Sequence, residues 1–567
     1  MTRFQVKSTH GGRDNTMERE KIFARLRPVL IGIILVVLCA AVFSATLSAD
    51  FVAQDDDIHV YYNPFLNPVT AAHILHFWRT PYEQLYIPLS YTVFSMLALL
   101  ARLPAPTRQS DGDIISLNPH IFHMADLALH LCNVILVFVL LRRLLPADKA
   151  HRDWAAAAGA LLFGIHPVQV ESVAWVSELR GLLAAFFSLL ALWVYVGFAR
   201  AGRKAAYILA SLCFGLALIS KPTAAAVPLI AWTLEYWILQ RPWCASAKAL
   251  IPWLALTVVF LLLTRGVQPV PVGTVGPLWT RPFIAGDALA FYLSKLLWPV
   301  NLCFDYGQTP TFVLRHWWGY VNWLVPVTLG VGVWLMRRRA PWLAATAMIL
   351  IAAVLPVLGF VPFLYQTFST VADRYLYLAL LGPALGLAFL LSQFGRKVAA
   401  WGVCAVLLLM LGFQSSVQVV YWNNSFALFQ HTLAINPNSY ITYFNLGVMD
   451  GQTGHKDLEM GLYREALRLN PACMQAHENL GADLAEAGKT AEAIAEFQQA
   501  VRLAPNEPLA RYDLASVLST RGDLAGAIAQ YREALRINPK LTPAKVGLEQ
   551  ALRKQASFGA AALLTGN

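Results

Sequence analysis

Long apolar runs separated by short basic loops fill the first three quarters of this 567-residue chain and restrict what it can fold into. Residues 1–437 carry 31 Lys and Arg against 19 Asp and Glu, whereas residues 438–554 carry 13 against 14. The whole chain is only 14% charged, although soluble domains have about 25% charged residues. This composition excludes a cytosolic enzyme, a disordered protein and a disulfide scaffold. It predicts a polytopic membrane domain followed by a soluble C-terminal domain.

Eleven segments have the apolar character of membrane spans, so we predict an all-α bundle of about eleven membrane helices. Two further apolar stretches are 84–103 and 284–299. If either crossed the membrane, basic loops would no longer all lie on the cytoplasmic side, so we expect both to be re-entrant or interfacial. The predicted spans are 28–49, 120–144, 154–172, 181–199, 205–220, 222–239, 249–264, 320–336, 341–359, 375–394 and 398–418.

The basic residues predict the orientation of this bundle. Residues 1–27 contain seven Lys and Arg, and five further basic loops fall on the same side if the N-terminus is cytoplasmic. An odd number of spans then places the C-terminal domain outside. We therefore expect a multi-pass protein of a bacterial inner membrane with a periplasmic C-terminal domain. Because the Lys and Arg residues lie in loops between apolar runs, their excess indicates membrane orientation rather than nucleic-acid binding.

A 34-residue period organises the C-terminal region. It repeats a Leu, a Gly, an Ala, an aromatic residue and a Pro in the same order, and it resembles the tetratricopeptide repeat. Small residues let paired helices approach closely, and Pro ends the second helix of each pair. We predict an α-solenoid whose concave face binds a peptide or a partner protein. The repeating residues include Pro437, Pro471, Pro505 and Pro539; Gly454, Gly488 and Gly522; and Ala466, Ala500 and Ala534.

Carboxylates gather at the start of the long predicted outside loop, residues 50–119. Asp55, Asp56 and Asp57 follow the first span directly. Adjacent carboxylates raise one another's pKa, and a general base or a metal ligand would justify their proximity. The alternative is a solvated loop that marks the end of the span.

A second outside loop carries unusual polarity for an apolar hairpin. It contains His166, Glu171, Glu178 and Arg180 within fifteen residues. These residues fit either a binding site or an ion-paired structural hairpin.

Three cations, Lys221, Lys295 and Arg374, are also predicted near the outer surface, against the charge rule. An anionic lipid phosphate would explain them, and snorkelling to the interface is the alternative. The sequence has no glycine-rich phosphate loop, no zinc-ligand set and no nucleophile elbow. An activated substrate would therefore arrive through the membrane.

Several short motifs, taken in order, resemble one known family. They are Asp55-Asp56 with Val60, Asn63 and Pro64; Pro88-Leu89-Ser90; His123, His130 and Asn133; the run from His166 to Ser177; Ser220-Lys221-Pro222; and Arg374-Tyr375-Leu376-Tyr377. Together with the repeats they are similar to the transmembrane and tetratricopeptide repeat-containing O-mannosyltransferases, within the broad GT-C glycosyltransferase fold. The sequence departs from the family pattern in three ways. Asp57 makes the acidic pair a triplet, Leu179 and Gly181 interrupt the polar run around Glu178, and Ile87 stands before Pro88 where a polar residue is common.

The resemblance implies domains as well as chemistry. Residues 1–27 would form a cytoplasmic basic N-terminus, 28–420 a GT-C-like transmembrane domain, 421–555 the repeat domain and 556–567 a tail. The implied reaction is an inverting transfer of a sugar from a polyprenyl-phosphate carrier to a protein Ser or Thr.

In that reaction Asp55 or Asp56 would be the general base, and Lys221 and Arg374 would neutralise the leaving phosphate. His166 and Glu171 would line the site, and Arg180 and Lys295 are further candidates for substrate binding. The sugar, the acceptor and the need for a divalent metal such as Mg or Mn stay open.

Two other functions remain as alternatives. One is a non-catalytic membrane scaffold that recruits periplasmic partners through its repeats. The other is a transporter or lipid flippase, although the predicted spans show no inverted repeat.

Overall fold

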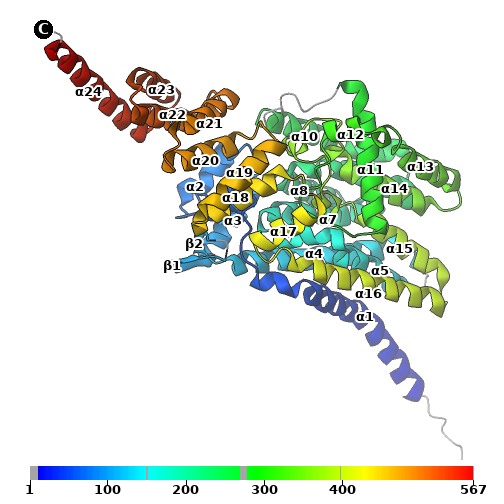
Figure 1. Ribbon diagram of the computed structural model, residues 1–567. Coiled ribbons are helices and arrows are strands. Elements are labelled where there is room, and N and C mark those ends of the chain that lie inside the picture. Colours follow the sequence, from blue (N-terminus) through cyan, green and yellow to red (C-terminus); the bar gives the residue numbers. More distant parts are fainter. Residues whose placement is uncertain (1–10, 111, 148–150, 268–276, 396, 566–567) are drawn as a thin grey trace, which may run out of the picture. The chain divides into compact units, whose positions relative to one another are not determined.

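The chain forms two compact helical units. The computed structural model describes residues 11–110, 112–147, 151–267, 277–395 and 397–565 (Figure 1). The first unit comprises residues 1–110 and 114–431, and the second comprises 111–113 and 432–567. The predicted N-terminal head and tail are thus described only in part, because residues 1–10 and 566–567 lie outside the described residues.

Helices make up nearly all of the first unit. Its longer helices are α1 (Gly11–Phe43), α3 (Pro88–Ala101), α4 (Pro119–Leu144), α5 (Arg152–Ile165), α7 (Leu179–Ala201), α8 (Lys204–Ser220), α10 (Trp243–Arg265), α11 (Arg281–Leu297), α13 (Leu324–Met336), α14 (Pro341–Val354), α15 (Leu381–Phe394) and α16 (Val398–Val420). Its shorter helices are α2 (Ala71–Arg79), α6 (Val170–Ala174), α9 (Val227–Thr233), α12 (Pro310–Arg315) and α17 (Ser425–Ile435), the last continuing into the second unit.

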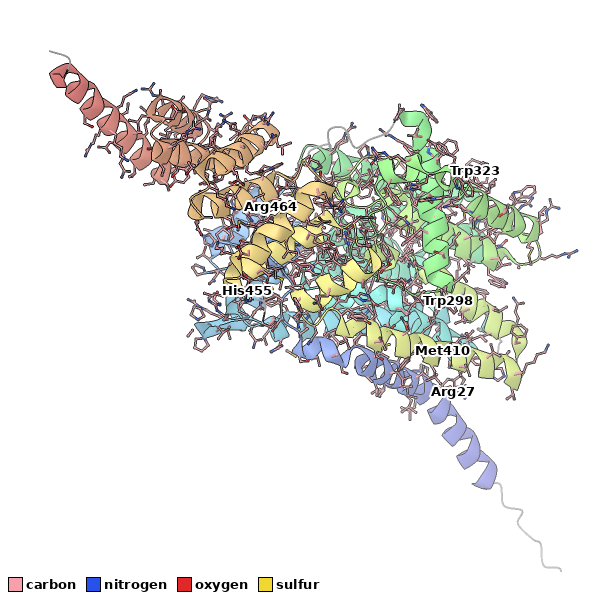
Figure 2. The ribbon with its side chains drawn as sticks, in the orientation of Figure 1. Arg27, Trp298, Trp323, Met410, His455 and Arg464 are labelled. Atoms are coloured by element: carbon pink, nitrogen blue, oxygen red, sulfur yellow. The ribbon has the colours of Figure 1, made fainter. Side chains whose placement is uncertain are left out.

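Among the described residues, six helical segments are long and apolar enough to cross a membrane by length and composition. Exposed apolar side chains such as Trp298 and Met410 suit contact with lipid (Figure 2). The six segments are Leu26–Ser48, Pro119–Leu144, Val176–Ala201, Trp243–Arg265, Trp317–Met336 and Val398–Val420.

Three helix breaks, within or beside the predicted spans, bear on function. α5 ends at Ile165, because the following Pro167 disfavours helical geometry at His166. α8 ends at Ser220, and Lys221 is extended before Pro222. The predicted span 375–394 becomes an α-helix only at Leu381, after a short turn over Asp373–Leu376. Polar residues therefore lie at interrupted ends of helices.

Glycines allow the helices around these breaks to pack closely. A Cβ at Gly159 of α5 would lie 2.4 Å from the carbonyl oxygen of Ala384 in α15. A Cβ at Gly164 would lie 2.6 Å from Sγ of Cys39 in α1. No larger side chain fits at either position without moving a neighbouring helix, so α5 lies firmly between its partners.

The predicted outside loop 50–119 has a core of its own. Phe77 of α2 stacks on Tyr91 of α3 with ring centroids 4.4 Å apart, and Tyr91 makes a 2.9 Å hydrogen bond to Nδ1 of His59. Strands β1 (Arg102–Arg108) and β2 (Ile114–Leu117) pair antiparallel at the end of the loop. The loop that begins with the three carboxylates is therefore an ordered element.

The second unit is a series of helix pairs with the predicted period. Gly454, Gly488 and Gly522 have φ values of 86°, 73° and 93°. This left-handed geometry ends a helix with little strain only at glycine. Ala466, Ala500 and Ala534 are fully buried. The helices are α18 (Tyr440–Thr453), α19 (Lys456–Leu469), α20 (Met474–Glu486), α21 (Thr490–Leu503), α22 (Pro508–Arg521), α23 (Leu524–Ile537) and α24 (Thr542–Thr565). The all-α fold class with a C-terminal repeat solenoid is confirmed.

Glycine-to-alanine substitutions in the first helix pair test this packing. A Cβ at Gly447 of α18 would lie 2.6 Å from the buried ring of Tyr463, whereas nothing lies within 4 Å of a Cβ at Gly461. We expect Gly447→Ala to destabilise the unit by about 1–3 kcal/mol through overpacking. The matched Gly461→Ala should stabilise it by about 0.5–1 kcal/mol, because alanine favours the helix.

Limited proteolysis of the purified full chain measures both effects. Cleavage within residues 440–540 should be faster for Gly447→Ala and slower for Gly461→Ala than for the unaltered protein. Equal cleavage rates for the two variants would contradict the tight contact between α18 and α19.

Candidate active site

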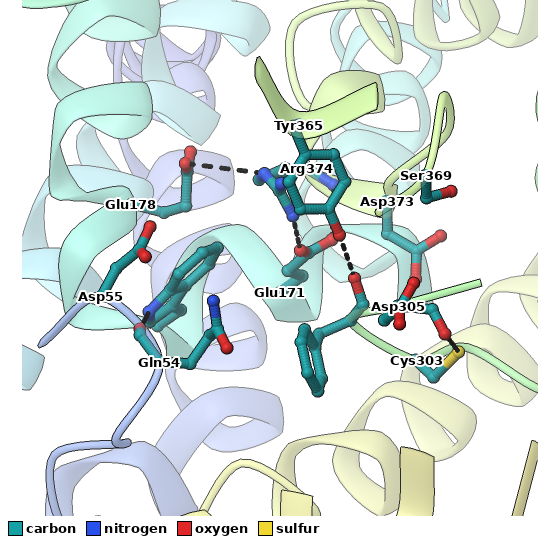
Figure 3. A network of polar contacts seen from close by, with 12 residues as sticks. Gln54, Asp55, Glu171, Glu178, Cys303, Asp305, Tyr365, Ser369, Asp373 and Arg374 are labelled. Atoms are coloured by element: carbon teal, nitrogen blue, oxygen red, sulfur yellow. Dashed lines mark hydrogen bonds and ion pairs between the residues drawn. The ribbon is translucent and has the colours of Figure 1, made fainter. Parts of the chain in front are cut away.

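A buried carboxylate, that of Glu178, is the centre of a charged cluster at the start of α7. Its Oε2 lies 2.6 Å from Nζ of Lys221. Its Oε1 lies 3.5 Å from Nε of Arg180 and 3.9 Å from Nε of Arg374. Glu178 is 1% exposed, so three cations converge on one carboxylate that water hardly reaches. Figure 3 shows its contact with Arg374.

Gly181 makes room for this cluster. A Cβ at this position would lie 2.5 Å from Oε2 of Glu178 and 3.3 Å from Nζ of Lys221. Any side chain here would displace the ion pair between Glu178 and Lys221. The glycine that interrupts the polar run in the sequence is therefore part of the architecture of the cluster.

A second buried carboxylate, Glu171 of α6, holds Arg374 from the other side. The backbone N–H of Arg374 donates to Oε2 of Glu171 over 2.8 Å, and its guanidinium donates to Oε1. The guanidinium also lies over aromatic rings, with centroid distances of 4.1 Å for Tyr365 and 5.2 Å for Trp175. Arg374 is thereby fixed in one orientation by charge and by cation–π contacts.

The two candidate bases from the first loop have different surroundings. Asp55, at a φ of 65°, accepts a 3.4 Å contact from Nη2 of Arg180 and is about one-third exposed. Asp56 is fully buried: its Oδ1 accepts from the backbone N–H and the hydroxyl of Ser177, and its Oδ2 accepts from Val52 N–H. Burial raises the pKa of Asp56 to about 7, although these hydrogen bonds oppose the shift. Asp55 thus reaches the charged cluster, whereas Asp56 anchors the loop.

Two predicted site residues, His166 and Lys295, make hydrogen bonds to backbone groups outside the cluster. Nε2 of His166 lies 3.2 Å from the carbonyl oxygen of Leu296, and its Nδ1 accepts from Val168 N–H. Nζ of Lys295 donates to the carbonyl oxygens of Val300 and Asn301, at 2.7 and 3.1 Å. The structure therefore brings together Asp55, Glu171, Arg180, Lys221 and Arg374 around Glu178. His166, at the end of α5, contacts α11 instead, and Lys295 of α11 holds the segment that follows that helix.

A pocket adjoins the two cations that the sequence assigned to phosphate binding. Lys221 and Arg374 line it together with Tyr375. Small residues of α7, including Ala184, Ala185 and Ser188, form one of its sides. The pocket thus combines a cationic end with a smooth, mainly apolar wall.

The sequence indicated Glu178 only as one member of the polar hairpin, with no role of its own, and it did not single out Tyr365. The contacts of Glu178 with Lys221 and Arg374 depend on how distant segments of the chain pack together, which the sequence does not show. Tyr365 lies in an apolar region with no motif of its own. Within the described ranges, no group of three or more His, Cys, Asp or Glu is arranged to hold a metal ion.

Comparisons with known proteins agree with the two-part organisation. A family model described as tetratricopeptide repeat matches residues 461–508 and 480–541. The chain is also 23% identical over 331 residues to a curated protein of Caenorhabditis elegans named Protein O-mannosyl-transferase F38B6.6. The match covers 54% of this chain and 44% of that protein, so the chain spans less than half the length of this relative.

Solved structures also match over about a quarter of the chain or less. A crystal structure of MamA is 21% identical, covers 23% of this chain and 72% of its own, and has a TM-score of 0.22. The first tetratricopeptide repeat domain of Spaghetti (RPAP3), bound to an HSP90 peptide, is 18% identical, covers 21% and 93%, and has a TM-score of 0.20.

These findings define the chain as a helical membrane protein with C-terminal tetratricopeptide repeats. The resemblance to the transmembrane and tetratricopeptide repeat-containing O-mannosyltransferases, drawn from the motifs in order, is confirmed.

Removal of the central carboxylate tests the cluster. Glu178→Gln would leave Lys221, Arg180 and Arg374 without their shared buried anion, and loss of one partner from a buried ion pair costs about 3–5 kcal/mol. We expect a large fall in the thermal unfolding midpoint of the full chain in detergent. Arg152→Gln is the control, because Asp153 keeps its closer partner Arg142 at 2.6 Å, and its effect should be below about 1 kcal/mol. Similar losses in the two variants would contradict a central role for Glu178.

The pH dependence of stability tests the burial of Asp56. Its pKa is about 7 in the folded chain and about 3.9 in an unfolded one. The folded state therefore keeps a proton that the unfolded state releases, and Asp56 lowers stability progressively as pH rises from about 4 to about 7.

Thermal unfolding at pH 5 and pH 7.5 should show this loss in the unaltered chain and a smaller one in Asp56→Asn. Burial lowers the pKa of His59 to about 4, which favours stability as pH rises, so the difference between the two proteins isolates Asp56. Parallel pH profiles would show that Asp56 has no raised pKa.

Proposed function

We propose that this protein is an integral-membrane inverting glycosyltransferase. It transfers a sugar from a polyprenyl-phosphate carrier to a Ser or Thr hydroxyl of a protein on the non-cytoplasmic face of a bacterial inner membrane. The observation that carries this proposal is the pocket lined by Lys221 and Arg374, together with the one-third exposed carboxylate of Asp55, which is linked to these cations through Arg180 and Glu178.

The pocket suits a lipid-linked phosphate. Lys221 and Arg374 present two cations to an anion, and an arginine fork matches the oxygens of a phosphate. The adjoining wall of Ala184, Ala185 and Ser188 on α7 would lie along the isoprenoid chain. A donor held in this way enters from the membrane, which is consistent with the missing nucleotide-binding motifs.

Asp55 is the general base in this mechanism, and Asp56 is a positioning residue. Asp55 is accessible, and one of its carboxylate oxygens lies 3.4 Å from Nη2 of Arg180. Both carboxylate oxygens of Asp56 accept hydrogen bonds from Val52 or Ser177. Asp56 could bind an acceptor hydroxyl only if these hydrogen bonds, which anchor the loop, were broken. The acceptor oxygen attacks the anomeric carbon, its proton passes to Asp55, and the bond from the anomeric carbon to the phosphate oxygen breaks.

The charges in the cluster also suit a reaction in which Asp55 takes the proton and the phosphate leaves. Asp55, Glu171 and Glu178 offset Arg180, Lys221 and Arg374 in the resting cluster. Protonation of Asp55 removes one negative charge. The departing phosphate changes from a diester to a monoester and gains one. The cluster therefore has a positive charge available where the transition state develops negative charge.

The repeat domain supplies the second part of the proposal. A tetratricopeptide solenoid offers a concave surface for an extended peptide or a partner protein. Binding of an acceptor by the repeats would raise its effective concentration at the membrane domain. Which sugar is transferred and whether a divalent metal takes part are not specified by this mechanism.

The scaffold alternative also has an observation in its favour. His166 and Asp56 are satisfied by protein groups, and Glu171 is paired with Arg374, as a structural hairpin requires. An assay of transfer separates the two functions.

The test is transfer of label in nanodiscs, from mixed polyprenyl-phosphate-linked sugars to a periplasmic protein extract. Asp55→Asn should lower the rate by at least about 100-fold, as loss of a general base does. Asp56→Asn should lower it less if the variant remains folded, and Lys221→Met should raise the donor concentration needed.

Size-exclusion profiles and thermal unfolding show whether each variant is folded. Transfer that persists in Asp55→Asn but vanishes in folded Asp56→Asn would reverse the two roles. An absence of transfer from every donor, with partner capture through the repeats intact, would favour the scaffold.

A further inference from the structure

A second group of cations lies at the far ends of α4 and α7. Arg143 is in the last turn of α4, and Arg200 is in the last turn of α7. Arg180 and Arg200 belong to the same helix and are twenty residues apart, which corresponds to about 30 Å. That is the thickness of the hydrocarbon core of a bilayer. Arg143 and Arg200 are therefore on the membrane surface opposite to the charged cluster around Glu178.

The carboxylates at this end are occupied by other cations. Asp153 lies 2.6 Å from Arg142 and 3.6 Å from Arg152. Glu235 is paired with Arg241 and accepts a 3.2 Å hydrogen bond from Tyr195.

No carboxylate among the described residues pairs with Arg143 or Arg200. Arg143 contacts α7 at Trp193 and Gly197, and Arg200 lies in the last turn of the same helix.

Contacts with α7 hold the side chain of Arg143 in place. Its Nη1 donates to the carbonyl oxygen of Trp193 over 3.0 Å, and its guanidinium carbon lies 5.3 Å from the centroid of the Trp193 ring. A Cβ at Gly197 would lie 2.7 Å from Nη2 of Arg143. The glycine thus provides the space in which the guanidinium rests.

Arg200 follows Gly197 by three residues and so faces the same side of α7. The two like charges are near enough to repel each other, and Arg200 is exposed. Arg143 is held against α7 and Arg200 is exposed nearby, and an anion bound by both guanidinium groups would relieve their mutual repulsion.

We propose that Arg143 and Arg200 bind the phosphate of an anionic phospholipid headgroup. The neighbouring surface favours a lipid over a soluble anion. Helix α8 packs along α7 and exposes Ile208, Leu209 and Leu212 to the surroundings. Acyl chains would cover these side chains while the headgroup rests on the arginines. This site does not depend on the proposed transfer reaction.

The test is native mass spectrometry of the full chain after delipidation and titration with cardiolipin or with phosphatidylcholine. The unaltered chain should retain cardiolipin in preference to phosphatidylcholine. Arg143→Gln and Arg200→Gln should each weaken cardiolipin binding about fivefold, which corresponds to the loss of one basic residue near a lipid surface. The double variant should weaken it further.

Arg338→Gln is the matched control, because Arg338 is an exposed cation in the loop between α13 and α14. Equal weakening by Arg338→Gln would show only non-specific attraction and overturn the proposal. Inorganic phosphate is titrated in parallel. If it displaces cardiolipin at equal concentration, the site takes a soluble anion and the lipid assignment fails. Thermal unfolding in detergent verifies that each variant is folded.

Discussion

The buried carboxylate of Glu178 is the interaction on which the charged end of the membrane domain depends. It neutralises Lys221 directly and lies within 4 Å of Arg180 and Arg374. Without it, three cations in a region of low dielectric would repel one another and destabilise the bundle. Through Arg180 and Arg374, the same carboxylate connects the first loop, at Asp55, with Glu171 and with the turn at residues 373–376.

Interrupted helices explain why this cluster can exist within an apolar bundle. The chain leaves helical geometry at His166 and Lys221, and Arg374 lies in a short helical turn that follows the extended residue Ala372. Each break leaves backbone N–H and C=O groups outside the helical hydrogen-bond pattern, and inside the membrane domain these groups need partners within the protein. Side chains at the same breaks supply them, as when Glu171 accepts from Arg374 N–H and His166 accepts from Val168 N–H. The polar side chains needed for chemistry and those needed to satisfy the broken helices are therefore partly the same groups.

The two ends of α7 differ in their charge balance. At its start, cations and carboxylates are matched and lie around a pocket. Near its end, Asp153 and Glu235 pair with Arg142 and Arg241, and no carboxylate in the described part of the chain pairs with Arg143 or Arg200. A matched cluster can respond to a proton transfer, whereas an unmatched pair of cations is suited to hold a permanent anion such as a lipid phosphate.

The sequence by itself determined the helical class, the repeat period and the kinds of residue at each helix break, because hydrophobic periodicity and glycine or proline positions act over neighbouring residues. Gly454, Gly488 and Gly522 needed no tertiary context to be placed. Only the tertiary structure decided that Glu178 gathers Lys221 and Arg374, and that Asp55 is accessible while Asp56 is enclosed. Those contacts join residues 43 to 196 positions apart in the chain. The distances between helix ends, rather than any local pattern, set which charges meet.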